Sequence, residues 1–381
     1  MAKAASPFSR PLYVMAKPIG AHCNLSCRYC YYLEKQHLYA DVPQHLMTEE
    51  TLEYFIQAYI EAQTTDEVLF TWHGGEPLLR PLSFYKKAVT LQQKYANGRR
   101  IANALQTNGT LLTEDWTRFL AENHWLVGVS IDGTQEMHDA FRINRQGRPS
   151  WVKVRRGIDL LNRFGVEWNA MAVVNNFNAD YPLDFYRFFR DELECRYLQF
   201  TPIVERGLDC NVAPRQWGEF LCQVFDEWVR RDVGEMFVQL FDATLANWVG
   251  VTPGVCTMAR DCGHAAVMEF NGDVYSCDHF VFPEHKLGNI RSHTLVEMLY
   301  GEQQTAFGRM KQDTLARQCR ECQWLFACNG ECPKNRWEGG LNYLCQGYRQ
   351  FFGHVAPAMD RMKELLQQGL PPADIMKEYG R

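Results

Sequence analysis

Three cysteines near the N-terminus have the spacing of a metal centre. Cys23, Cys27 and Cys30 follow one another as C-x3-C-x2-C, directly after a short apolar run that we expect to form a strand. Three thiolates on a four-iron cluster leave the fourth iron open to a small ligand, whereas an electron-carrying cluster is bound by four. A zinc site would need a fourth ligand, which His22 or His37 could supply. The spacing therefore favours an iron-sulfur cluster with one open iron, with zinc as the alternative.

Eight further cysteines are concentrated in the last third of the chain. Eight thiolates can make two sites of four, and either zinc or iron-sulfur clusters could occupy such sites. Clusters make better chemical sense beside an open-iron site, because zinc cannot accept an electron. The eight are Cys256, Cys262, Cys277, Cys319, Cys322, Cys328, Cys332 and Cys345. The remaining three, which we expect to be ordinary buried or surface thiols, are Cys195, Cys210 and Cys222.

Alternating strand and helix patterns would position the first cysteines at the edge of a parallel sheet. Six apolar runs with helix-period segments between them predict an α/β fold, either an incomplete barrel or an open doubly wound sheet. The motifs CNLSCRYC, HGGEP, QTNG and SIDG follow the first four runs in turn. Because the carboxyl ends of parallel strands build the active face of such folds, we expect the four motifs to meet at one rim. The six runs are 12–17, 68–72, 101–106, 126–131, 168–174 and 197–204.

The predicted secondary structure and the density of cysteines change in the second half of the chain. Residues 214–249 have the pattern of amphipathic helix, and after Cys256 the expected strands become short and cysteines dense. Asn271-Gly272 marks a hairpin turn between apolar partners. The boundary falls between about residues 205 and 250, and we divide the chain into a domain of residues 1–230 and a cysteine-rich domain of residues 231–381 that ends in a helix.

Composition is that of a globular protein of the cytoplasm. Lys and Arg number 40 against 45 Asp and Glu, and no run of like charge suggests a nucleic-acid or lipid surface. No stretch approaches the roughly 18 apolar residues of a membrane span, and the N-terminus lacks the apolar core of a signal peptide. In a reducing compartment the 14 cysteines argue for metal binding rather than a disulfide framework. We therefore expect neither nucleic acid nor membrane as a partner.

At CNLSCRYC the sequence resembles the radical SAM superfamily, in which an aromatic residue, here Tyr29, precedes the third cysteine. The resemblance implies that the open iron binds S-adenosylmethionine, whose one-electron reduction gives methionine and a 5'-deoxyadenosyl radical. Gly74 and Gly75 would allow close backbone approach, and Glu76 would accept from the cofactor's ammonium group. The remaining implied contacts are an adenine face at Tyr29, a ribose or carboxylate contact at Ser130, a carboxylate partner at Arg142 and an adenine-side strand at Val204.

These contacts have plainer alternatives. GGEP, TNG and IDG are also ordinary turn sequences, and Arg142 could be a surface cation on a helix. His73 precedes the glycine pair where some relatives have Gln, so we assign it no role.

The later cysteines resemble the SPASM extension of peptide-modifying radical SAM enzymes. The resemblance implies a partial (β/α)6 barrel followed by a SPASM domain with two auxiliary clusters, which makes three [4Fe-4S] clusters in the chain. It also implies a crossed partition of the ligands. One cluster would take Cys256, Cys262, Cys277 and Cys332, and the other Cys319, Cys322, Cys328 and Cys345.

Within this group the sequence is similar to the anaerobic sulfatase-maturating enzymes from about residue 11 to about residue 360. Stretches that carry the similarity include PLYVMAKPIGAHCNLSCRYCYYLEK, VLFTWHGGEPLLRPLSFYKKA and PGVCTMARDCGHAAVMEFNGDVYSCDHFVFPEHKLGNI. The family converts Cys or Ser in a sulfatase C/S-x-P/A-x-R segment to Cα-formylglycine. Expected partners are therefore an unfolded or nascent sulfatase and a flavodoxin- or ferredoxin-type reductant, and we expect a monomer.

The resemblance also implies a base and a peptide contact. Asp278 would take the proton of the target side chain, with His279 as a weaker candidate, and the neighbouring thiolate cluster should raise the basicity of Asp278. Asp278 could instead merely end the hairpin. Tyr32 would contact the peptide, or pack on the rim.

Two other functions remain possible from the sequence. One is a different SPASM enzyme that builds thioether or carbon-carbon links in peptides, although only about a dozen residues precede the first strand, where such enzymes carry a precursor-binding domain. The other is a non-catalytic electron carrier or zinc scaffold, which the open-iron motif argues against.

Overall fold

The computed structural model describes residues 11–42 and 44–380. The chain divides into two compact units, each built from several segments. The first unit runs to Val129 and also includes Arg142–Trp168 and Gly263–Arg309. The second unit consists of Ser130–Phe141, Asn169–Cys262 and Met310–Arg381.

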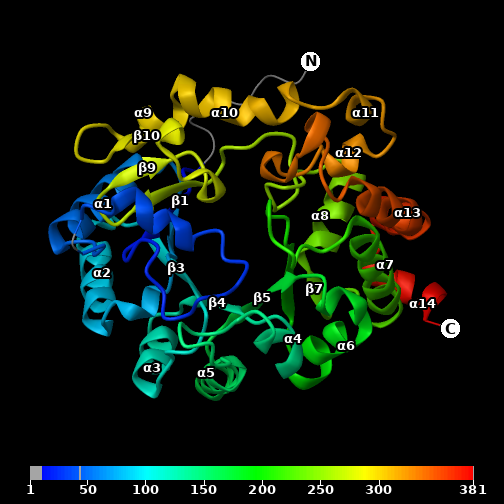
Figure 1. Ribbon diagram of the computed structural model, residues 1–381, viewed down its shortest axis with the longest axis horizontal. Coiled ribbons are helices and arrows are strands. Elements are labelled where there is room, and N and C mark those ends of the chain that lie inside the picture. The colour runs from blue at the N-terminus through cyan, green and yellow to red at the C-terminus, as the bar shows by residue number, and fades with distance from the viewer. Residues whose placement is uncertain (1–10, 43, 381) are drawn as a thin grey trace. The chain divides into compact units, whose positions relative to one another are not determined.

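The sheet of the first unit joins segments from both halves of the sequence. Its strand order is β10-β9-β8-β1-β2-β3-β4, so β8 from the cysteine-rich region lies directly beside β1. In Figure 1 the yellow β9 and β10, from the same region, lie on the β1 side of the sheet. β1 to β4 are parallel, β8 pairs with β1 in parallel, and β9 and β10 continue antiparallel. Gly272 has a φ of +87° in the turn between β8 and β9, so the hairpin expected at Asn271-Gly272 is confirmed. The strands are β1 (Val14–Lys17), β2 (Glu67–Trp72), β3 (Arg100–Thr107), β4 (Leu126–Ser130), β8 (Ala266–Glu269), β9 (Asp273–Tyr275) and β10 (Lys286–Asn289).

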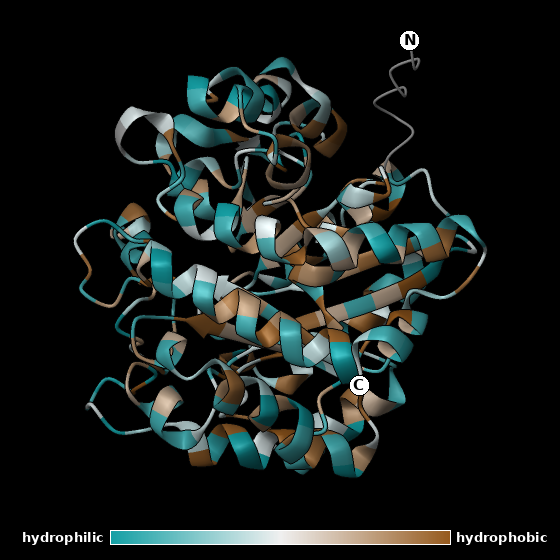
Figure 2. Ribbon diagram, turned by 90° about the vertical axis from the view of Figure 1, so that its right-hand side faces the viewer, coloured by the Kyte–Doolittle hydropathy of each residue, from teal (hydrophilic) through white to brown (hydrophobic). Residues whose placement is uncertain are grey.

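Amphipathic helices cover this sheet. Figure 2 faces the right-hand side of Figure 1, where helices near the C-terminus likewise mix polar and apolar residues. Of the helices on this sheet, the first begins after Thr48, whose hydroxyl accepts from the Thr51 backbone N–H at 3.1 Å. Its buried face packs toward a stack of aromatic rings around Trp72. The helices are α1 (Glu49–Ala62), α2 (Leu82–Tyr95), α3 (Glu114–Glu122), α5 (Trp151–Phe164) and α9 (Leu295–Tyr300).

The second unit has three parallel strands in the order β5-β6-β7. Two long helices, α7 and α13, pack closely because glycines face each other: a Cβ at Gly347 would lie 2.3 Å from the Pro214 carbonyl oxygen. The strands are β5 (Trp168–Val174), β6 (Tyr197–Pro202) and β7 (Phe237–Val238). The helices are α4 (Gln135–Asp139), α6 (Pro182–Arg187), α7 (Pro214–Arg231), α8 (Gln239–Trp248), α11 (Arg317–Arg320), α12 (Leu325–Cys328), α13 (Cys345–Gln367) and α14 (Met376–Tyr379), and α10 (Glu302–Asp313) runs through the division between the units.

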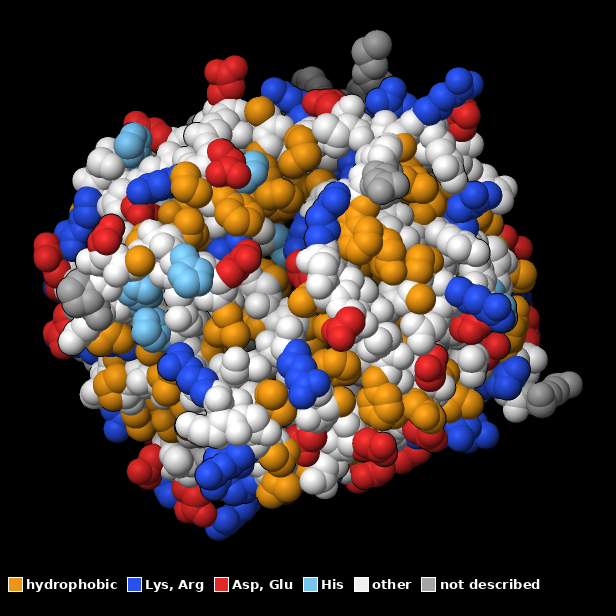
Figure 3. Space-filling model, in the orientation of Figure 1, with side chains coloured by type: hydrophobic (Ala, Val, Ile, Leu, Met, Phe, Trp, Pro, Cys, Tyr) orange, Lys and Arg blue, Asp and Glu red, His pale blue; other side chains and the backbone are white. Residues whose placement is uncertain are grey.

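All six predicted strands are therefore present, within a few residues of their expected bounds. On the face of the molecule in Figure 3, acidic and basic side chains are interspersed, in keeping with the small net charge of -5. Among the described helices, none has both the length and the apolar composition that crossing a membrane would require.

Candidate active site

The loop after β1 presents the first three cysteines. Its backbone turns tightly, since the Cys30 N–H donates to the Cys27 carbonyl at 3.1 Å and the Leu25 N–H to the Cys23 Sγ at 3.3 Å. Burial raises the pKa of the Cys23 thiol to about 12, and the nearby Glu76 adds to this. Iron bound to this sulfur would stabilise the thiolate and so displace the proton. The three soft sulfur donors fit an iron-sulfur cluster.

The GGEP loop packs against the backbone of this cysteine loop. The Gly75 N–H donates to the Gly20 carbonyl at 2.7 Å and the Glu76 N–H to the His22 carbonyl at 2.8 Å. A Cβ at Gly75 would lie 2.0 Å from the His22 oxygen, so no larger residue fits. The close backbone approach expected at Gly75 is therefore made, at least in part, to the backbone of the cysteine loop itself.

The side chain of Glu76 is fully buried and organises the rim. Its carboxylate accepts from the Thr107 hydroxyl at 2.7 Å and from the N–H groups of Asn108 and Leu78 at 2.7 and 2.9 Å. Burial raises the pKa of Glu76 to about 7, although these hydrogen bonds oppose the shift. The expected contact with a cofactor ammonium group stays a prediction.

The QTNG loop completes this side of the rim. Asn108 Nδ2 donates to Asn24 Oδ1 at 2.9 Å and to the Cys23 sulfur at 3.7 Å, and Asn24 Nδ2 donates to the Thr110 hydroxyl at 2.8 Å. Three of the four predicted rim motifs therefore meet within the first unit. Asn24 was not singled out from the sequence, where nothing distinguishes it from any loop asparagine.

The other predicted cofactor residues are divided between the units. Arg142 is 7% exposed and its guanidinium lies 5.5 Å from the centre of the Tyr29 ring, so the surface-cation alternative is wrong. Ser130 ends β4 and is half-buried. Val204 is buried in the second unit, where its carbonyl accepts from Lys334 Nζ at 3.3 Å. Their roles toward the cofactor stay predictions.

Asp278 lies in a buried polar cluster of the first unit that the sequence did not reveal. Its carboxylate forms an ion pair with Lys17, the last residue of β1, and accepts from the Tyr31 hydroxyl. The Lys17 ammonium also lies over the Tyr32 ring, 3.3 Å from its centre. Tyr32 is itself buried and donates to Glu269 at the end of β8, so its expected peptide contact stays a prediction.

The expectation that Asp278 would be unusually basic is wrong in this structure. Burial by itself would raise the pKa of Asp278, but Lys17 and, more weakly, His73 and His279 outweigh it and hold that pKa below the ordinary value. In the sequence the thiolate of Cys277 adjoins Asp278, whereas Lys17 lies far away along the chain. Asp278 is therefore a carboxylate throughout the neutral range.

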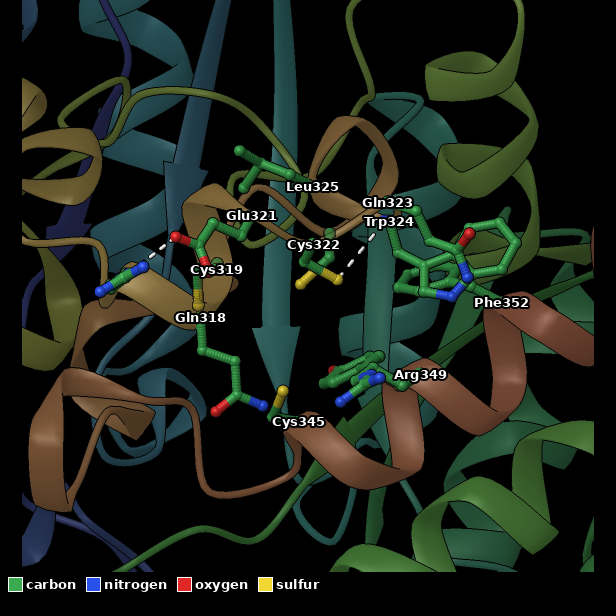
Figure 4. A pocket seen from close by; sticks show the side chains of 14 residues that line it. Gln318, Cys319, Glu321, Cys322, Gln323, Trp324, Leu325, Cys345, Arg349 and Phe352 are labelled. Carbon is green, nitrogen blue, oxygen red and sulfur yellow. Dashed lines mark hydrogen bonds and ion pairs between the residues drawn. The ribbon is translucent and has the colours of Figure 1, made fainter.

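A cavity of about 620 Å³ in the second unit gathers four of the later cysteines. In Figure 4 the sulfur atoms of Cys319, Cys322 and Cys345 face the same space, with Arg349 beside them. Cys328 completes the set, which is the one expected to bind a single auxiliary cluster. The cavity and its four thiols fit such a group.

The other set of four cysteines is divided between the units. Cys277 belongs to the first unit and Cys256, Cys262 and Cys332 to the second. All 14 cysteines lie within the described residues and none forms a disulfide. No group of three or more His, Cys, Asp or Glu side chains in residues 11–42 and 44–380 is arranged to hold a single metal ion.

Comparison with known proteins decides the family. Residues 18–189 match the radical SAM superfamily and residues 260–323 match SPASM, an iron-sulfur cluster-binding domain. A serine-type anaerobic sulfatase-maturating enzyme of Bacteroides thetaiotaomicron is 62% identical over 98% of this chain and 96% of its own. The chain belongs to the anaerobic sulfatase-maturating enzymes. Like other members of this family, it is a radical SAM enzyme with three [4Fe-4S] clusters, and the zinc alternatives are set aside.

Other anaerobic sulfatase-maturating enzymes are more distant. The serine-type enzyme of Klebsiella aerogenes is 38% identical over 92% of this chain and 87% of its own, and a cysteine-type enzyme of Clostridium perfringens is 31% identical over 92% and 97%. The solved structure of native anSMEcpe with bound AdoMet and the Cp18Cys peptide matches with a TM-score of 0.85 at 31% identity, covering 93% of this chain and 99% of that one. The expected fold is thereby confirmed.

Proposed function

We propose that this enzyme oxidises a serine in the C/S-x-P/A-x-R segment of a sulfatase to Cα-formylglycine. The observation that carries the proposal is the 62% identity to a serine-type maturating enzyme across almost the whole of both chains. Cysteine-type relatives are also similar, at 31 and 32% identity. Serine is therefore the favoured target, and acceptance of cysteine is the point to test.

The proposed ligand sets are those expected from the sequence. The loop after β1 would hold the cluster that binds S-adenosylmethionine, with Tyr29, Glu76 and Arg142 among the cofactor contacts. When bound there, S-adenosylmethionine supplies the radical that removes a hydrogen atom from the target Cβ. The clustering of Cys319, Cys322, Cys328 and Cys345 around one cavity supports the proposed partition of the auxiliary ligands.

The chain's own residues would handle the proton. Converting a serine side chain to an aldehyde removes one hydrogen atom from Cβ, one proton from the hydroxyl and one further electron. Asp278 is an ionised, partly exposed carboxylate, with a side chain that is 16% exposed, so it can accept that proton. Lys17 and Tyr31 hold its two oxygens and so fix its orientation.

The remaining proposals concern organisation and partners. We propose a flavodoxin- or ferredoxin-type reductant, a monomeric enzyme, a cytoplasmic location and a sulfatase chain that is still unfolded when it is modified. We also propose that residues 1–230 form the radical SAM domain and residues 231–381 the SPASM domain with its C-terminal helix, although β8 of the later segment pairs with β1.

Three matched peptides would test the function. They carry Ser, Cys or Ala at the first position of an otherwise identical x-x-P-x-R segment. They would be incubated without oxygen with reduced enzyme and S-adenosylmethionine, then analysed by mass spectrometry. We expect the Ser peptide to lose two hydrogen atoms and to form an aldehyde, with 5'-deoxyadenosine released in step. Formation of 5'-deoxyadenosine with every peptide unchanged would overturn the substrate assignment and favour another SPASM peptide modification.

A further inference from the structure

Two buried cations in the second unit lie among the loops that carry the auxiliary-cluster cysteines. Lys311, near the end of α10, has a side chain with no exposed surface, and Arg336 is 9% exposed. Among the described residues, neither forms an ion pair with a carboxylate. A buried charge without a counter-charge is costly, so both demand an explanation.

Lys311 holds the loop that bears two cysteines. Its ammonium donates to the backbone carbonyls of Cys256 and Thr257 at 2.9 and 2.8 Å, and also to that of Ala259. Three acceptors satisfy the three N–H donors of a lysine but leave its charge unbalanced. The loop therefore receives a fixed orientation and a net positive charge beside Cys256.

Arg336 connects Lys311 to the turn at Gly330, which lies between Cys328 and Cys332. Its Nε donates to the Gly330 carbonyl at 3.1 Å, and its Nη1 to the Lys311 carbonyl at 2.8 Å and the Thr314 hydroxyl at 3.0 Å. Nη2 is buried and has no hydrogen-bond partner in the part of the chain that the structure describes. A Cβ at Gly330, with φ of +72°, would lie 2.6 Å from Nη2, so only glycine leaves room for this donor.

Arg336 lies beside thiols of both proposed ligand sets. The Gly330 carbonyl that accepts from its Nε is two residues from Cys328, in one set, and two residues from Cys332, in the other. The nearby carboxylate, Glu331, accepts from the side-chain amides of Asn335 at 3.0 Å and of Asn342, not from either cation. The unpartnered Nη2 donor and the excess positive charge therefore point to a negatively charged group absent from the described contacts.

We propose that Lys311 and Arg336 are positioning residues whose charges raise the reduction potential of the auxiliary clusters. This inference rests on the proposed function, because it takes the eight later cysteines to be the ligands of those clusters. A cluster bound by four thiolates is already anionic and gains a further negative charge on reduction, so a fixed cation nearby stabilises the reduced form. The clusters then more readily accept the electron that serine oxidation releases.

Reduction potentials would test the proposal without using activity. In the full-length chain, changing Cys23, Cys27 and Cys30 to Ala leaves only the auxiliary clusters to be titrated and followed by electron paramagnetic resonance. Lys311→Met and Arg336→Gln remove the charges, and Lys311→Arg and Arg336→Lys keep them. Arg361→Gln, which removes a partly exposed cation that pairs with Glu364 and Glu378, is the control for net charge.

We expect each charge-removing variant to lower a cluster potential enough to change the ratio of reduced to oxidised cluster at least tenfold, about 59 mV for one electron. The charge-keeping variants should shift by less than half of this, and Arg361→Gln should not shift. Unmoved potentials in both neutral variants, or equal shifts in the control, would overturn the proposal. If Lys311→Met and Arg336→Gln lose iron while Lys311→Arg and Arg336→Lys retain it, the result supports the proposal. If all four variants lose iron, the two residues have a purely structural role and the proposal is overturned.

The outcome is separable from that of the proposed function. Peptide conversion by the otherwise unaltered enzyme is measured independently of these potentials. Shifted potentials in an enzyme that leaves the Ser peptide unchanged would refute the proposed substrate alone. Normal conversion with unmoved potentials would refute only the role given to Lys311 and Arg336.

Discussion

Replacing Lys17 with methionine should change how the reaction depends on pH. Lys17 is fully buried and its ion pair with Asp278 holds the pKa of that carboxyl below its ordinary value, against the opposing effect of burial. Methionine fills a similar volume without the charge, so burial then dominates. Losing one partner of a buried ion pair costs about 3–5 kcal/mol, which corresponds to roughly two to four units of pKa at about 1.36 kcal/mol per unit.

The sign of this effect is fixed by the two states of Asp278. With Lys17 present, the depressed pKa contributes stability above the unfolded pKa, and that stability is lost only as pH falls through the folded value. Without Lys17 the carboxyl becomes easier to protonate, and a protonated Asp278 cannot accept the substrate proton. As pH is lowered from roughly 7 to 4, formylglycine formation by Lys17→Met should therefore begin to fall roughly two to four pH units above the point at which the wild-type rate falls.

The assay is the rate of peptide oxidation across this pH range, with 5'-deoxyadenosine measured in the same samples. Lys35→Met is the matched control, because Lys35 is also a buried lysine over an aromatic ring, 3.3 Å from the centre of Phe282, and pairs with Glu34 instead. A Lys17→Met enzyme with the wild-type rate and pH profile would refute this account of Asp278. So would an equal change in Lys35→Met.

Three further substitutions probe the same site. Asp278→Asn should keep all clusters and measurable S-adenosylmethionine cleavage while product formation falls by roughly 10²–10⁴-fold, the usual contribution of a general base; unchanged product formation would remove Asp278 from this role. Tyr31→Phe removes a hydrogen bond to that carboxylate, worth about 1.5–3 kcal/mol, and should slow peptide oxidation by roughly 10- to 100-fold with S-adenosylmethionine affinity unchanged; a loss of affinity would argue that Tyr31 instead supports the cofactor. Gly75→Ala places a Cβ 2.0 Å from the His22 oxygen and should lower the iron content and abolish S-adenosylmethionine cleavage. Gly254→Ala, with open space around its Cβ, is the control and should change neither. An active Gly75→Ala enzyme would show that the cysteine loop can shift.

Strand periodicity and motif position were enough to predict which loops meet at the rim. The runs before CNLSCRYC, HGGEP and QTNG became β1, β2 and β3, and parallel pairing brought their following loops together. The identity of the contacts was not predictable in the same way. Glu76 carries a carboxylate suited to an ammonium ion, yet three donors from its own and the QTNG loop already occupy it. Local sequence does not show which of two partners a buried carboxylate will find.

The group of polar side chains around Asp278 was not predictable for a different reason. Lys17 is the last residue of a short buried strand, where a lysine suggests nothing more than a strand end. Its partner lies 261 positions further along the chain, and only tertiary pairing brings the two together. The error over the basicity of Asp278 follows directly, since its neighbours in sequence include a thiolate but not the lysine.

Pairing of β1 with β8 is what assembles this part of the site. Lys17 and Glu269 are register partners at the ends of these strands, and the hairpin that follows β8 returns to deliver Asp278. Tyr31 and Tyr32, beside the third cysteine of the radical loop, then bond to Asp278 and Glu269. The loop expected to generate the radical and the carboxylate expected to take the proton are thus parts of one packed unit. Because Lys17 would be a buried cation without a partner if the later segment were absent, the geometry of the first loop depends on residues that follow it by more than half the chain.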